Sequence, residues 1–111
     1  MKTINIPEFG EYTIDIGEYL SNRNTSVVLR STYAPDFIKL STNTHIILPA
    51  HKFAVKNYPE NARIIDTVFD SKLFIDTGET ISLPNNLIVP IWELSASLIE
   101  SALIERLTNR G

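Results

Sequence analysis

The chain has 111 residues, with thirteen acidic and ten basic side chains, a formal net charge of −3 and no cysteine. A hydrophobic fraction of 43% beside a charged fraction of 21% is typical of one globular domain with a modest core, and it argues against a basic nucleic-acid binder or a densely acidic nucleic-acid mimic. The lack of cysteine excludes disulfides, cysteine-ligated zinc and thiol catalysis, and it fits a reducing cytoplasm.

The N-terminal residues MKTINIPEFGEY alternate between polar and apolar side chains and lack the apolar centre of a signal peptide. The longest apolar runs are short and are interrupted by Pro49 and Pro90. We therefore expect no membrane span and a cytoplasmic location.

The first forty residues carry a strong strand pattern. Alternation at residues 3–6 stops at a turn containing proline and glycine and resumes at residues 12–16, which predicts a β-hairpin. Further strands are predicted at residues 26–31 and 37–42, with Pro35-Asp36 in the turn between them. The pattern predicts an antiparallel meander.

The middle of the chain is more ambiguous. Residues 53–55 are typical of another strand, whereas Ile46-Ile47-Leu48 fits a strand, a helical turn or a packed loop. These alternatives stay open from the sequence.

A short central helix is predicted within residues 57–71. Pro59 suits its first turn, and Asn57 and Glu60 have the spacing of a capping box. The helix is short, so packing on the sheet must stabilise it. The face expected to make this contact contains Ala62, Ile65, Val68 and Phe69.

The stretch LFIDTGET, residues 73–80, reads like the catalytic strand of an aspartic protease. Such a site needs two carboxylates that share a proton, and in a small chain the second one comes from another copy. The likeness ends at residue 78, Glu79 stands where that family has a small residue, and the remaining chain has no place for a flap hairpin. We therefore expect a structural turn between two short strands, with Asp76 accepting backbone hydrogen bonds and Gly78 adopting a positive φ.

No other constellation predicts catalysis. His45 and His51 are the two histidines, and neither forms a recognised zinc spacing with an acidic residue. The sequence has no Gly-x-Ser-x-Gly nucleophile motif and no phosphate-cradling glycine loop. We expect a protein that is not an enzyme, with no catalytic residue, no metal and no cofactor.

The N-terminal hairpin is rich in acidic residues, with no base between Lys2 and Arg23. The simplest interpretation is the solvated side of a sheet. The functional alternative is a docking patch for a protein partner, in which a tyrosine anchors the contact and the carboxylates provide charge complementarity. The candidate partner-binding residues are Glu11, Tyr12, Asp15, Glu18 and Tyr19.

The C-terminal part begins with an extended run at residues 87–94, where Pro90 indicates an edge position or a bulge. An amphipathic helix is predicted over residues 95–111, with Ser97 and Glu100 as a capping box. Its apolar stripe contains Leu98, Ile99, Ala102, Leu103 and Leu107. Ile104 lies outside that stripe, so a homodimer contact through Leu103, Ile104 and Leu107 is a further expectation.

These elements together predict one α+β domain over residues 1–111. It contains an antiparallel β-sheet meander, a short central helix and a C-terminal amphipathic helix.

The segments FGEYTIDIGEY, SVVL, KLSTN, FAVKNYPENARIIDTVF, LFIDTGET and VPIWEL follow one another over about residues 4–94. In this pattern the chain resembles an uncharacterised family of small proteins carried on bacterial phages, plasmids and conjugative elements, a domain of unknown function. Residues 95–111 look like an extension. The chain departs from the family at Leu83-Pro84-Asn85-Asn86, where members tend to carry a glycine.

The resemblance implies no activity and no catalytic residue. It implies a non-enzymatic accessory protein in the cytoplasm of a bacterial host, which binds a protein partner such as a host defence complex and inhibits a restriction or CRISPR system. A nucleic-acid-binding accessory protein is the alternative function, and a hydrolase using Asp76 is the third.

Overall fold

The structure is a computed structural model that describes residues 2–58, 61–84 and 86–109. The side chains of the last helix are described as far as Ile104. The elements are β1 (Thr3–Ile6), β2 (Gly10–Glu18), β3 (Thr25–Ser31), β4 (Phe37–Lys39), β5 (Ser41–Thr42), β6 (Lys52–Val55), α1 (Ala62–Asp70), β7 (Phe74–Ser82), β8 (Ile88–Leu94) and α2 (Ala96–Asn109). All pairings between neighbouring strands are antiparallel, and the fold class is α+β, as the sequence predicts.

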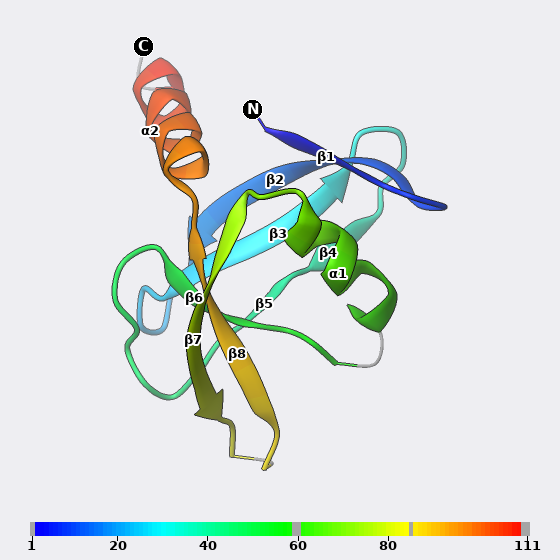
Figure 1. Cartoon of the computed structure of the whole chain (residues 1–111). Coiled ribbons are helices and arrows are strands. Elements are labelled where there is room, and N and C mark those ends of the chain that lie inside the picture. Colours follow the sequence, from blue (N-terminus) through cyan, green and yellow to red (C-terminus); the bar gives the residue numbers. More distant parts are fainter. Residues whose placement is uncertain (1, 59–60, 85, 110–111) are drawn as a thin grey trace.

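The strands form two sheets rather than one. The first has the order β1-β2-β3-β4 and is the predicted meander, whereas the second has the order β5-β6-β8-β7 (Figure 1). The chain passes from one sheet to the other within the segment that the sequence predicts as a single strand at residues 37–42. Leu40 is fully buried there and its N–H donates to Val27 O at 3.0 Å, so the chain bends at Leu40 and Ser41 enters the second sheet.

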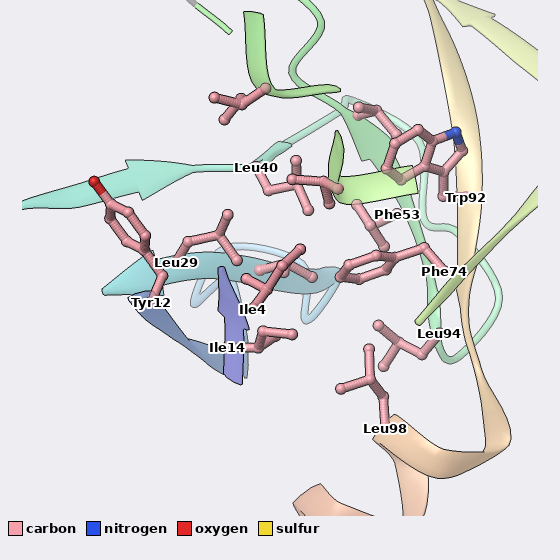
Figure 2. Close-up of a cluster of buried hydrophobic side chains, with 14 of the residues drawn as sticks. Ile4, Tyr12, Ile14, Leu29, Leu40, Phe53, Phe74, Trp92, Leu94 and Leu98 are labelled. Carbon is pink, nitrogen blue, oxygen red and sulfur yellow. The ribbon is translucent and has the colours of Figure 1, made fainter. Parts of the chain in front are cut away.

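The main hydrophobic core lies between the two sheets and contains side chains from both sheets and both helices. Its centre is a group of aromatic rings. Phe53 lies edge-on to Phe74 and Trp92, with centroid distances of 5.7 and 6.4 Å (Figure 2). A smaller cluster covers the other face of the second sheet and contains Ala54, Ile81, Leu83, Val89 and Ile91.

The triplet Asp76-Thr77-Gly78 lies inside the continuous strand β7. The register with β8 shifts between Asp76 and Thr80, so the triplet forms a β-bulge. Asp76 Oδ1 accepts a hydrogen bond from the Gly78 N–H at 2.9 Å, and Gly78 has φ +80°. The predicted local geometry of Asp76 and Gly78 is present, but the predicted division into two strands is wrong, because pairing with β8 resumes after the bulge.

Replacing Gly78 with alanine is expected to lower the free energy of unfolding by about 1–2 kcal/mol, because a Cβ makes the left-handed conformation unfavourable. The control is Gly17→Ala. At Gly17 an added Cβ would meet Ser26 Oγ at 3.5 Å, an ordinary contact, so little change is expected. Urea unfolding of both variants measures the difference, and equal midpoints would contradict the assignment of Gly78 to a strained bulge.

The central helix begins later than predicted and has a different cap residue. Asn61 is the cap residue, and its side chain donates to Lys39 O at 2.9 Å and to Lys56 O at 2.7 Å rather than to the helix. The predicted capping residue Glu60 and the predicted first-turn Pro59 lie outside the described residues.

The buried positions of α1 are Ile64 and Val68, whereas Ala62 is exposed. Phe69 is 36% exposed and packs against Trp92 at a centroid distance of 5.3 Å. Ile65 is partly buried against the main core, so the predicted contact is confirmed for Ile65, Val68 and Phe69. It is wrong for Ala62, and the sequence pattern did not show that Ile64 also contacts the core.

Helix α2 projects from the end of β8 (Figure 1). Ser95 Oγ accepts the Leu98 N–H at 3.3 Å and Ser95 O accepts the Ile99 N–H at 3.1 Å, so Ser95 caps the helix instead of the predicted Ser97. Leu98 is 2% exposed, but Leu103 is 56% exposed and Ile104 55%. The side chain of Leu107 lies outside the described part. Among the described residues, neither helix has the length and apolarity needed to cross a membrane.

Candidate functional site

The five candidate partner-binding residues do not form one surface, because successive side chains of a strand point to opposite faces. Tyr12 is 2% exposed and belongs to the main core with Ile14. Figure 2 shows its hydroxyl directed away from the other core side chains. Burial, followed by the nearby Asp36 carboxylate, raises the pKa of the Tyr12 phenol above its ordinary value of 10.0. The prediction that Tyr12 anchors a partner at the surface is wrong.

Asp15 lies on the outer face of the first sheet, where it is not an isolated acid. Its Oδ2 lies 2.9 Å from Arg30 Nε, and both side chains are about half exposed. Asp15 is the register partner of Val28, which is in turn the partner of Lys39, so bases and acids share this face. The outer face is thus mixed in charge, and the predicted acidic patch is absent there. Glu11 is half-buried near the other end of the same strand.

Glu18 and Tyr19, although adjacent in sequence, contribute to two different hollows. Glu18 lies at the edge of a groove beside α2, and Tyr19 lines a pocket near β5, where its hydroxyl is 2.8 Å from Ser41 Oγ. The structure therefore distributes the five residues among the core, the outer face and these two hollows.

The larger hollow has a volume of about 500 Å³ and is here called the helix groove. It lies between α2, the end of β2 and the loop that precedes β6. Its apolar walls are Ile16, Ile47, Leu48, Ala50, Leu94, Ile99, Ala102 and Leu103. The polar side chains at its edge are Glu18, Asn22, Arg23, Thr25 and His51.

One wall of the helix groove is irregular chain held in place by Asn24, which is 4% exposed. Its side-chain nitrogen donates to Ile46 O at 2.9 Å, and its side-chain oxygen accepts the Leu48 N–H at 2.8 Å. Asn22 adds a bond from its side chain to Thr44 O at 2.9 Å. Residues 46–48 are thus a loop and neither a strand nor a helical turn, and hydrogen bonds of its backbone hold it while the side chains of Ile46 and Ile47 stay exposed.

The walls of the helix groove remain partly uncovered. Ile47 is 74% exposed on the loop side, and Leu103 is 56% exposed on the helix side. Neither Glu18 nor Arg23 forms an ion pair within the described part of the chain. The arrangement offers apolar contact area with charges of both signs at its edge, which is the composition of a protein-binding surface.

The two histidines are both exposed. His51 lies at the edge of the helix groove, and its backbone carbonyl accepts the Leu94 N–H at 2.9 Å. Over residues 2–58, 61–84 and 86–104, no group of three or more histidine, aspartate or glutamate side chains is placed to hold a metal ion.

Sequence reasoning missed Asn24 and Ile47 as parts of a site. The signal for Ile47 was the apolar run at residues 46–48 in an otherwise polar stretch, and Asn24 resembled an ordinary turn residue. The groove brings together residues 16–25, 47–51 and 94–103, so no motif spacing could reveal it.

No protein-family model, no curated protein and no solved structure matches this chain. The resemblance to small proteins of bacterial mobile elements, with its shared region at residues 4–94, therefore stays a prediction.

Proposed function

We propose that the protein is a non-enzymatic binding protein and that an apolar helical segment of a protein partner docks in the helix groove. The observation that carries this proposal is the exposure of Leu103, at 56%, in the wall of a groove of about 500 Å³. Isolated apolar residues are normal on a protein surface, but a continuous apolar hollow with a polar edge favours a binding role.

The form of α2 supports the proposal. Leu98 is packed into the core, whereas Leu103 and Ile104 belong to later turns that leave the body of the protein. A helix of 14 residues has little stability of its own in water, so these turns gain stability from a partner that covers them.

A helix suits the groove better than an extended strand. Residues 47–51 form an irregular wall and the opposite wall is the helix α2, so a partner in the groove meets mainly apolar side chains. A helical segment instead inserts side chains at positions i, i+3 and i+4 and needs only apolar walls. Arg23 and Glu18 favour a segment that carries an acidic and a basic residue beside its apolar anchors.

The proposed setting is the one that the family resemblance implies. The partner would belong to a host defence complex of a bacterial cell, and the protein would act as its inhibitor in the cytoplasm. Support for this part comes from the resemblance alone.

Replacing Leu103 with glutamate is expected to reduce capture of the partner at least about tenfold, because burying an unpaired carboxylate costs more than 1.4 kcal/mol. The measurement is quantitative capture from bacterial lysate with identification by mass spectrometry. Sedimentation of the purified protein measures in addition whether the partner is a second copy of this chain.

The matched control is Ile88→Glu. Ile88 is 61% exposed, and the start of β8 lies at the end of the molecule opposite α2 (Figure 1). A partner lost with Leu103→Glu and retained with Ile88→Glu supports the groove. Equal capture of the partner by both variants would overturn the proposal. The proposal also fails if Leu103→Glu abolishes self-association and no other interaction.

A further inference from the structure

A second hollow, of about 350 Å³, lies where the outer face of the first sheet meets β5 and the chain after β6. We call it the lysine pocket, and six of its lining residues carry charged or hydroxyl groups that a ligand could contact. They are Tyr19, Lys39, Ser41, Thr42, Lys56 and Tyr58. The helix groove shares none of them.

The lysine pocket has a positive lining in a chain of net charge −3. Lys39 and Lys56 both contribute to it, and none of the described residues that line it is acidic. Lys39 forms no ion pair within the described part of the chain. The Lys56 Nζ lies 5.5 Å from the centroid of the Tyr58 ring, which places its charge on one wall.

Hydroxyl groups complete the lining and are held in fixed positions. Ser41 is 2% exposed, and its Oγ accepts the Val27 N–H at 2.9 Å and lies 2.8 Å from the Tyr19 hydroxyl. Thr42 Oγ1 lies 3.4 Å from the Tyr58 hydroxyl. Both phenols are thus bonded to consecutive residues of β5, which keeps their O–H groups at the pocket wall.

We propose that the lysine pocket binds the phosphate group of a small phosphate monoester. Such a group carries about −1.5 to −2 charges at neutral pH and three acceptor oxygens. The Lys39 ammonium supplies a positive charge for this group, Lys56 adds a second cation to the lining, and the hydroxyl groups donate to the oxygens. A volume of 350 Å³ lies within the range of about 300–1,000 Å³ found for small-ligand sites, so there is room for more than the phosphate.

The test is a titration followed by amide NMR, with inorganic phosphate, adenosine monophosphate and a short single-stranded oligonucleotide as probes. Phosphate and the mononucleotide are expected to shift the amide signals of Ser41, Thr42 and Lys56, and Lys39→Gln is expected to raise the Kd at least about fivefold. The matched control is Lys52→Gln, because Lys52 pairs with Glu79 at 3.3 Å away from the pocket. It should leave the Kd unchanged.

No saturable shift with either small probe would overturn the proposal, as would equal weakening by Lys39→Gln and Lys52→Gln. If the oligonucleotide shifts the same amide signals and binds far more tightly than the mononucleotide, the ligand of the pocket is a nucleic-acid strand and not a small phosphate monoester. The helix groove takes no part in this experiment. A negative result for the lysine pocket would therefore leave the proposal of partner docking untouched.

Discussion

Replacing Phe53 with alanine is expected to lower the free energy of unfolding by about 3–5 kcal/mol, a large part of the total stability of a domain this size. Phe53 is 1% exposed and lies edge-on to Phe74 and Trp92, so the truncation removes contacts with both rings and leaves a cavity between the sheets. Urea or guanidinium unfolding followed by circular dichroism measures the change.

The control for this variant is Phe37→Ala. Phe37 lies on β4 and is 52% exposed, so its loss is expected to change the free energy of unfolding by no more than about 0.5 kcal/mol. A loss below about 1 kcal/mol for Phe53→Ala would contradict the view that these rings hold the two sheets together.

Replacing Asn24 with alanine is expected to cost about 1–3 kcal/mol of stability and to loosen one wall of the helix groove. The buried side chain of Asn24 accepts the Leu48 N–H at 2.8 Å and donates to Ile46 O at 2.9 Å. In the variant Ile46 O keeps a hydrogen bond, because Thr44 Oγ1 also donates to it at 2.6 Å. The Leu48 N–H has no such second partner, so its hydrogen bond is lost without replacement. The loop is then free to move, and partner capture should fall with it.

Hydrogen exchange at the Leu48 amide measures this effect directly, since that amide loses its protection in Asn24→Ala while the core strands keep theirs. Asn5→Ala is the control, because Asn5 is exposed on β1 and lies outside the groove. Unchanged exchange at Leu48 would show that Asn24 does not hold the loop.

The first sheet follows from the sequence because each of its strands has one buried face and one solvated face. Ile4, Ile14 and Leu29 alternate with polar residues, and that period is local information. The second sheet is harder, because β6 pairs with β8 as well as with β5, whereas β7, the next strand in the chain, pairs with β8 and not with β6, and no local pattern states which strands pair.

The errors at Leu40 and Tyr12 have a common origin. At Leu40 an apparently continuous strand changes sheets, and the reason is the burial of one side chain in a core that the sequence does not display. Tyr12 was predicted as an aromatic anchor at the margin of the acidic patch, yet the alternation of the strand places it on the face of Ile14, which lies in the core. In both cases burial in the core decided the outcome.

The candidate sites were the least predictable part. Glu11 and Asp15 lie on one face of β2 and Glu18 lies on the other, so the acids of this strand do not form one patch. Lys39 and Lys56 meet in one pocket only because β4 and the chain after β6 come together. The C-terminal helix is different, because the position of Ile104 outside the apolar stripe predicts that part of its apolar surface is not covered by the core. Leu103 and Ile104 are exposed in the structure, while the predicted homodimer stays a prediction.

The most direct measurement of partner docking is photo-crosslinking in bacterial cells with benzoylphenylalanine at position 103 or at position 88. The positions are similarly exposed, but only Leu103 borders the helix groove. The account predicts one crosslinked partner protein from position 103 and none of it from position 88. The same products from both positions, or no product from position 103, would contradict docking in the helix groove.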